Sequence, residues 1–310
     1  MTADREAFGL LEMGSNSLKL YLVPRGADRD EAVETVKLPW RVAHDLFERG
    51  SLSPQAALEV VRCVGDAKRH LEDRGVSGTM AIATGVFREL PELDDLTERL
   101  VTETGVRPRV ISGQDEAALM ARGFRELGIS APAVMCDLGG ASLEWAFMPG
   151  RGAAQSGSLP LGAIRNKYRF ARLEHAPQEW LAQSSAYCDE ALATLPVAGA
   201  PRIVATGGTA EALASVVGKG RVTAAELTAV IDRVRREGAP PGLKEGRRSV
   251  LLPGLVILSR VVARCGADGL TYGTSAVRLG MVRRLIQLLE RFPPDELHAT
   301  QLLGATRHGR

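Results

Sequence analysis

A short polar segment near the start of the chain carries residue types that can bind phosphate. Glu12 is followed by Gly14, Ser15, Asn16 and Ser17. Glycine adopts backbone angles that are closed to other residues, and hydroxyl, amide and backbone N–H groups can donate to phosphate oxygens. The carboxylate of Glu12 could hold a divalent metal. Taken alone, the segment is more typical of an ordinary hairpin turn.

The same pattern returns about 125 residues further along the chain, as Asp137, Gly139, Gly140, Ala141 and Ser142. Both segments have the order acid, apolar residue, glycine, two small or polar residues and serine. Both lie between apolar runs that predict strands. A period of this length is typical of domain duplication, so we expect two like domains, each with a phosphate loop.

A third glycine segment contains Gly207, Gly208 and Thr209. It follows the apolar run 202–206 and precedes a stretch with helical spacing. Glycines between a strand and a helix N-terminus allow an anion to approach the backbone closely. No Gly-Lys-Ser/Thr follows at the required spacing, so this is not a Walker A loop.

Three further charged residues lie where chemistry is possible. Arg88 comes just after a short buried strand, where its planar fork suits phosphate, although an ion pair with Glu89 or Glu92 would also explain it. Glu116 lies in the first turn of a helix, where an acid can complement the helix dipole or activate water. Glu144, on the strand after the second loop, is either an outward-facing residue or a metal-side carboxylate.

Composition narrows the classes of function. The chain is 45% hydrophobic and 25% charged, as in an ordinary globular protein. Its formal net charge of +2 gives no general electrostatic argument for nucleic acid. No apolar run reaches the roughly 18 residues that span a bilayer, no secretory signal is evident, and the four cysteines are dispersed. We therefore expect a cytoplasmic protein with no membrane partner.

Alternating strands and helices around each loop predict an α/β protein. At 310 residues the chain is long enough for two domains, each with its own core. We place the first domain at residues 1–128 and the second at 129–280, divided by a turn-rich stretch.

Taken together, the motifs resemble the exopolyphosphatase/guanosine pentaphosphate phosphatase (Ppx/GppA) family of the actin, Hsp70 and sugar kinase fold superfamily. Six segments match in order, namely 12–17, 83–88, 111–117, 137–144, 158–162 and 205–209. The chain departs from the family at two of these positions. The family usually has Asp where Glu12 stands, and often Gly where Ala141 stands.

The resemblance implies two actin-like (ribonuclease H-like) ATPase-type domains facing a central cleft, with a C-terminal helix at about 281–310 packing back on the first. It implies a Mg²⁺-dependent hydrolase, an exopolyphosphatase that removes terminal phosphate from inorganic polyphosphate. Glu116 resembles the family's general base, and Arg88 would neutralise phosphate charge. Asp137 and Glu144 resemble its magnesium-side carboxylates, and Glu12 would join them.

Other activities stay open at this point. Guanosine pentaphosphate 5′-phosphatase is the second activity that the resemblance implies. A phosphotransferase that makes ATP from ADP and a non-catalytic polyphosphate or nucleotide sensor are further alternatives. The sequence leaves the oligomeric state open, and a homodimer would lengthen the binding groove.

Overall fold

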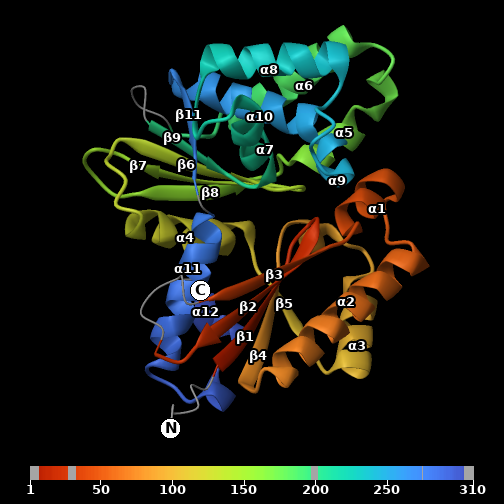
Figure 1. Ribbon diagram of the computed structural model, residues 1–310, viewed down its shortest axis with the longest axis vertical. Coiled ribbons are helices and arrows are strands. Elements are labelled where there is room, and N and C mark those ends of the chain that lie inside the picture. Colours follow the sequence, from red (N-terminus) through yellow and green to blue (C-terminus); the bar gives the residue numbers. More distant parts are fainter. Residues whose placement is uncertain (1–6, 27–32, 197–201, 274, 304–310) are drawn as a thin grey trace. The chain divides into compact units, whose positions relative to one another are not determined.

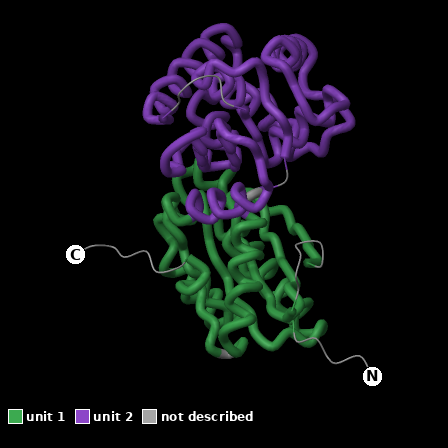
Figure 2. The backbone as a smooth tube through the Cα atoms, turned by 90° about the vertical axis from the view of Figure 1, so that its left-hand side faces the viewer, with its two compact units in different colours: residues 1–115, 278–310 green, residues 116–277 purple. Residues whose placement is uncertain are grey.

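The computed structural model describes residues 7–26, 33–196, 202–273 and 275–303. The chain divides into two compact units, residues 1–115 with 278–310 and residues 116–277 (Figure 2). The chain passes from unit 1 to unit 2 within helix α4 (Gly113–Glu126) and returns within helix α11 (Ala276–Leu289). The boundaries expected from the sequence, at 128 and 280, stay predictions, and residues 304–310 of the expected C-terminal segment lie outside the described residues.

Unit 1 is built on a five-stranded sheet of order β3-β2-β1-β4-β5 (Figure 1). Its first strand is buried along its whole length, as its continuous apolar sequence predicts for a central strand. The strands are β1 (Ala7–Met13), β2 (Ser17–Pro24), β3 (Glu34–Pro39), β4 (Val76–Ala83) and β5 (Pro108–Val110). The helices assigned to this unit, besides α4 and α11, are α1 (Val42–Arg49), α2 (Pro54–Asp73), the 3₁₀ helix η2 (Gly85–Glu89), α3 (Leu93–Thr104), η4 (Pro294–Glu296) and α12 (Ala299–Leu303).

Unit 2 is built on a six-stranded sheet of order β10-β11-β9-β6-β7-β8. The strands are β6 (Ala133–Leu138), β7 (Leu143–Met148), β8 (Gln155–Leu159), β9 (Arg202–Thr206), β10 (Arg221–Thr223) and β11 (Gly269–Tyr272). The helices are α5 (Ala163–Arg169), η3 (Ala171–Leu173), α6 (Pro177–Leu192), α7 (Gly208–Val217), α8 (Ala224–Glu237), α9 (Glu245–Arg248) and α10 (Leu251–Cys265).

The two sheets repeat one topology. In unit 1, β1, β2 and β3 form an antiparallel meander, while β4 pairs parallel to β1 and β5 parallel to β4. In unit 2, β6, β7 and β8 form the same meander, β9 pairs parallel to β6, and β11 pairs parallel to β9. The edge strand β10 is the addition in unit 2. The duplication predicted from the two loops is therefore present in the folds of both units.

Helix α10 is the central helix of unit 2 and contacts α5, α6, α7 and α8. Leu251, Leu255 and Leu258 recur at helical spacing and are fully buried. Burial of each such side chain contributes roughly 1.5–3 kcal/mol, so this apolar stripe fixes the helix against its neighbours.

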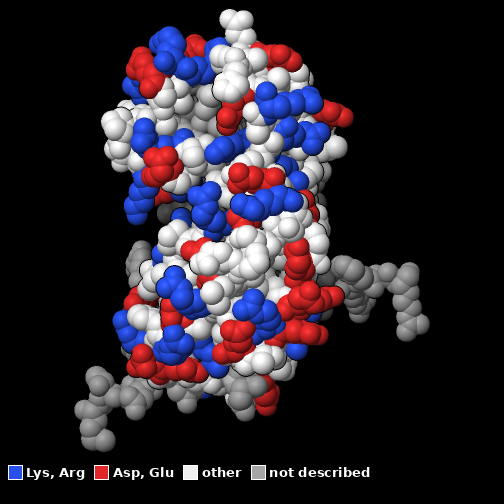
Figure 3. Space-filling view, turned by 90° about the vertical axis from the view of Figure 1, so that its right-hand side faces the viewer, with Lys and Arg blue, Asp and Glu red and all other residues white. Residues whose placement is uncertain are grey.

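Surface charge is mixed. Figure 3 shows Lys and Arg interspersed with Asp and Glu over the described parts of the visible face. Among the described residues, no helix has both the length and the apolar character needed to cross a bilayer.

Candidate active site

The first predicted loop is a tight hairpin between β1 and β2. The backbone N–H of Gly14 donates to the carbonyl oxygen of Ser17 at 3.0 Å and closes the turn. The hydroxyl of Ser15 accepts a hydrogen bond from the backbone N–H of Val86 at 3.1 Å. Because Val86 belongs to η2, this bond joins the loop to the 3₁₀ helix that carries Arg88.

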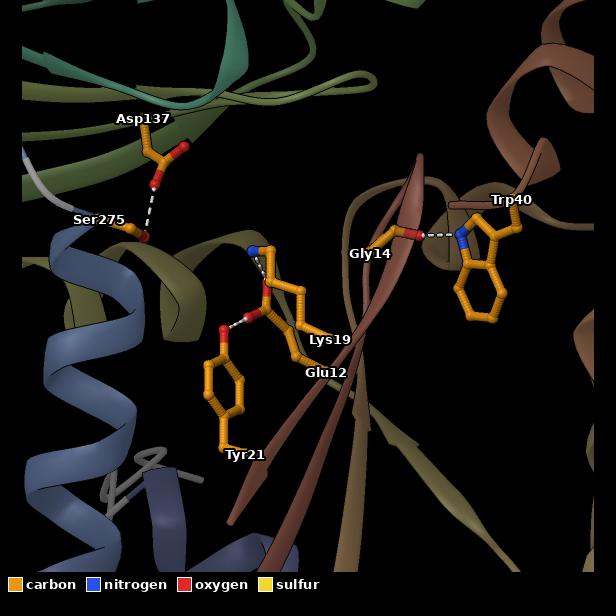
Figure 4. Close-up of polar contacts among 7 residues, drawn as sticks. All are labelled: Glu12, Gly14, Lys19, Tyr21, Trp40, Asp137 and Ser275. Atoms are coloured by element: carbon orange, nitrogen blue, oxygen red, sulfur yellow. Dashed lines mark hydrogen bonds and ion pairs between the residues drawn. The ribbon is translucent and has the colours of Figure 1, made fainter. Parts of the chain in front are cut away.

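Three successive carbonyl groups of this loop are held by the segment that follows β3. The Trp40 indole N–H donates to the Gly14 carbonyl oxygen at 2.8 Å (Figure 4). The backbone N–H groups of Ala43 and Trp40 donate to the carbonyl oxygens of Ser15 and Asn16 at 3.1 and 3.3 Å. In a trans peptide the C=O and the next N–H point in opposite directions. The N–H groups of residues 15–17 therefore point away from this segment, as in a backbone anion nest.

The second predicted loop has the same construction. The backbone N–H of Gly139 donates to the Ser142 carbonyl oxygen at 3.0 Å. Backbone N–H groups of residues 163–165, at the start of α5, donate to the carbonyl oxygens of Gly139 and Gly140 at 2.9–3.0 Å. The guanidinium Nε of Arg165 donates to the carbonyl oxygen of Ala141 at 2.8 Å. The same three carbonyl positions are thus held in both loops, and the N–H groups of residues 140–142 point away from α5.

Ala141 is only 1% exposed. Its methyl group therefore lies in the interior, and the alanine that stands in place of the family's frequent glycine does not narrow the outer face of the loop.

Gly162 is required by the close approach of α5 to the second loop. A Cβ atom here would lie 2.2 Å from the carbonyl oxygen of Gly140, although the backbone angles of φ −126° and ψ 156° are open to any residue. We expect Gly162→Ala to destabilise unit 2 by about 1–3 kcal/mol, since the backbone must shift to admit the methyl group. Thermal unfolding measures this. Gly150→Ala is the matched control, because a Cβ there meets nothing within 4 Å, and equal effects of the two would contradict the prediction.

The hairpin of the second loop brings two predicted carboxylates together. Asp137 on β6 pairs directly with Glu144 on β7. Directly opposed residues of antiparallel strands point to the same face, with Cβ atoms about 4.5–5.5 Å apart. The Ser158 hydroxyl donates to Glu144 Oε1 at 2.8 Å, and the Ser275 hydroxyl donates to Asp137 Oδ2 at 3.2 Å (Figure 4). Both carboxylates are therefore held in fixed orientations.

Glu116 on α4 adds a third carboxylate to this group. Glu116 and Glu144 are 8% and 3% exposed. Burial raises the pKa of Glu144 well above its ordinary value, and the negative charges of Glu116 and Asp137 raise it further, while hydrogen bonds from Ser158 and Ser142 oppose the shift. The three acids are therefore close enough to interact in a poorly solvated place, an arrangement typical of functional sites.

Asp137 and Glu144 fit a magnesium ion that is held by few protein ligands. Among the described residues, no group of three or more His, Cys, Asp or Glu side chains has the arrangement of a complete metal cage. Mg²⁺ commonly keeps several waters and takes one or two carboxylates together with substrate phosphates. The carboxylate oxygens of Asp137 and Glu144 are hard ligands of the kind that Mg²⁺ takes. A cation bound there would also relieve the repulsion between the negative charges at this site.

The third glycine segment lies beside Asp137. Gly207 has a φ of +88°, and a Cβ atom at this position would meet the Leu138 carbonyl oxygen at 2.4 Å and Asp137 Oδ1 at 3.0 Å. Only glycine therefore lets the end of β9 pass this close to the carboxylate. Thr209 is 1% exposed, and its side chain packs against Gly254 of α10. The side chain of Thr209 therefore faces the interior. The phosphate contact predicted at Thr209 would have to be made by its backbone.

The guanidinium of Arg247 lies against Gly208. Burial lowers the pKa of Arg247, which Glu211 partly offsets with an ion pair at 3.9 Å. The sequence contained no indication of this cation beside the glycine segment, because Arg247 is 39 positions from Gly208 and belongs to none of the matching motifs.

In unit 1, both oxygens of Glu12 have partners. Lys19 Nζ donates to Oε1 at 2.7 Å and the Tyr21 hydroxyl donates to Oε2 at 2.5 Å (Figure 4). The guanidinium of Arg88 donates to the Ile111 carbonyl oxygen at 3.4 Å, a bond that links η2 to the end of β5.

Sequence reasoning missed several residues that hold the site. Trp40, Arg165 and Ser158 contact residues 14–26 positions away in the chain. The sequence did contain a partial indication that Lys19 and Tyr21 lie near Glu12. Alternate residues of a strand share a face, and a two-stranded hairpin fixes the register of its strands. The pairing of Lys19 with Glu12 could have been deduced in this way.

The duplicated sheet, with a matching loop in each copy, defines a two-domain α/β protein of the actin-like class. The model of the Ppx/GppA phosphatase family matches residues 31–289. The chain belongs to the Ppx/GppA phosphatase family, which confirms the resemblance seen in its motifs. Exopolyphosphatase 1 of Mycobacterium leprae is 30% identical over 253 residues, which cover 76% of this chain and 70% of that protein.

Solved structures agree on the fold. An exopolyphosphatase from Cytophaga hutchinsonii superposes with a TM-score of 0.74 at 19% identity, covering 91% of this chain and 98% of its own. The Aquifex aeolicus Ppx/GppA enzyme superposes with a TM-score of 0.71 at 20% identity, covering 90% and 99% of the two chains. These similarities confirm the predicted actin-like fold class.

Proposed function

We propose that this chain is an exopolyphosphatase, a phosphoanhydride hydrolase that removes the terminal phosphate of inorganic polyphosphate. One observation carries the proposal. In unit 2, the charges of Glu116 and Asp137 both act on the buried carboxyl group of Glu144, beside a loop whose N–H groups point away from the helix that holds it. Such a site combines donors for phosphate oxygens, carboxylates for a metal, and an acid able to act on water.

The binding role falls to backbone and metal-side groups. The N–H groups of the two loops, at 15–17 and 140–142, would each take phosphate oxygens, and the segment 207–209 would add a third backbone contact. Asp137 and Glu144 would hold Mg²⁺. When bound, that ion would neutralise charge on the phosphate oxygens. Arg88 would contribute a cation of fixed charge.

The chemical role falls to Glu116. Its carboxylate would orient a water molecule toward the terminal phosphorus and accept its proton as the new P–O bond forms. The bond between the terminal phosphorus and the bridging oxygen breaks, and the shortened polyphosphate leaves with that oxygen. Inorganic phosphate is the second product.

The comparisons support the same activity. The family is one of phosphatases, and a 30% identical relative is named an exopolyphosphatase. Polyphosphate is our choice of substrate because the groups assigned above recognise phosphate oxygens and metal, and none of them is specific to a base or sugar.

The first test is phosphate release from long-chain polyphosphate by the whole chain, with Mg²⁺ and with EDTA. We expect release that requires the metal, because charge on the terminal phosphate must be neutralised for attack. Guanosine pentaphosphate is the competing substrate in a parallel assay. A higher kcat/KM for guanosine pentaphosphate would move the assignment to that activity, and ATP formation from ADP would indicate a phosphotransferase. Tight binding of polyphosphate without turnover would support a sensor.

A further inference from the structure

The two hairpin loops agree in backbone and differ in charge at one pair of residues. Glu12 on β1 pairs directly with Lys19 on β2, and Asp137 on β6 pairs directly with Glu144 on β7. Both loops close with the same hydrogen bond of 3.0 Å, from Gly14 to Ser17 and from Gly139 to Ser142. At equivalent places unit 2 therefore has two acids, and unit 1 has an acid with a base.

The carboxylate of Glu12 is already engaged within unit 1. Its two oxygens accept hydrogen bonds from the Lys19 ammonium and the Tyr21 hydroxyl, and Glu12 is 6% exposed. A metal bound by Glu12 would have to share these oxygens with the two donors or displace one of them, and it would then lie beside the Lys19 ammonium. Like charges so close repel strongly in a poorly solvated place. The surroundings of Glu12 therefore disfavour a cation, whereas those of Asp137 and Glu144 favour one.

The length of the glutamate explains these contacts. Lys19 and Tyr21 are two residues apart on β2, so their side chains lie on one face of the strand. Tyr21 is fully buried, and the centre of its ring lies 5.9 Å from the guanidinium carbon of Arg278 on α11. Aspartate, which the family usually has here, is one methylene shorter. It would reach less far toward the two donors.

The Lys19 side chain is 29% exposed, so this residue is partly accessible to solvent, two positions after Ser17 of the loop. The ion pair with Glu12 restricts an otherwise flexible four-carbon side chain.

We propose that Glu12 is a positioning residue that holds the Lys19 ammonium beside the loop at 14–17, and that it is not a metal ligand in this chain. Of the three carboxylates predicted to hold metal, Asp137 and Glu144 then keep that role. The inference rests on the proposed function for the nature of the substrate, while its statement about the metal is independent of any substrate.

The statement that Glu12 is not a metal ligand is tested by titrating Mg²⁺ into the metal-free full chain by calorimetry, without substrate. We expect Glu12→Gln to bind Mg²⁺ as the wild type does, and Asp137→Asn to lose about tenfold or more in affinity. Equal losses in the two variants would overturn the proposal. Lys19→Met adds a second arm, on a partly exposed residue, should Glu12→Gln fail to fold. If Glu12 were a ligand, removal of the competing ammonium would strengthen Mg²⁺ binding.

The statement that Glu12 positions Lys19 is tested by measuring the binding of inorganic tripolyphosphate in the presence of EDTA. We expect Lys19→Met to weaken binding and to reduce the slope of log Kd against log salt by about one. Glu12→Gln and Glu12→Asp should weaken binding in the presence of Lys19 and have no effect in the Lys19→Met background, because Glu12 acts through the lysine. Additive effects would overturn the proposal. Failure of the wild type to bind tripolyphosphate would count against the proposed substrate, and the Mg²⁺ titration would still decide the role of Glu12.

Discussion

Replacement of Glu116 by glutamine is expected to lower the turnover of polyphosphate by about 10²–10⁴-fold, the usual contribution of a general base. Glutamine keeps the size of the side chain and removes its ability to accept a proton from water. Binding should persist, because the loops and the metal-side carboxylates are unchanged. The measurement is kcat by phosphate release, together with the Kd of tripolyphosphate by calorimetry.

Asp115→Asn is the matched control for this variant. Asp115 precedes Glu116 on α4 and interacts with Ser112, whose hydroxyl donates to its carboxylate at 2.7 Å and accepts from its backbone N–H at 3.1 Å. Asparagine keeps the second of these bonds and can accept the first, so turnover should stay within a few-fold of the wild type. If Glu116→Gln also stays in that range, Glu116 is not the base.

Replacement of Glu144 by glutamine should have opposite effects on stability and activity. The pKa of Glu144 is raised, chiefly by burial and then by the charge of Glu116, so ionising this carboxyl costs the folded metal-free protein more than it costs the unfolded chain. Glutamine removes that cost. We expect a gain on the order of 1 kcal/mol, or about 2–4 °C in Tm, for the metal-free protein at neutral pH. Activity should fall, since the metal loses a ligand.

The direction of the pH dependence follows from linkage. A carboxyl whose folded pKa lies above its ordinary value of 4.5 stabilises the fold fully only below that value, and the contribution is lost as the pH rises through the folded pKa. The advantage of Glu144→Gln in Tm should therefore be small near pH 4 and should grow as the pH rises above 4.5, until the pH passes the folded pKa. Added Mg²⁺ should narrow the difference at neutral pH, because it binds the carboxylate of the wild type. A Tm difference that shrinks as the pH rises would contradict the raised pKa.

The sequence by itself determined the parts of this protein that depend on local order. Glycine and small polar residues between two apolar runs specify a hairpin, and their recurrence at Asp137 predicted the duplicated fold that the sheets contain. The N-terminal cap of helix α2 also depends on residues that are close together in the sequence. Ser53 caps α2 as its position before Pro54 predicts, by accepting from the Ala56 N–H at 3.1 Å.

Only the tertiary structure decided which side chain meets which. The motif marked Glu12 as a metal-side carboxylate and Thr209 as a phosphate contact, yet Glu12 is held by Lys19 and Tyr21, and the side chain of Thr209 faces Gly254 in the core of unit 2. A motif records spacing along one segment. The partners of a side chain depend on strand register and on helices that arrive from distant parts of the chain.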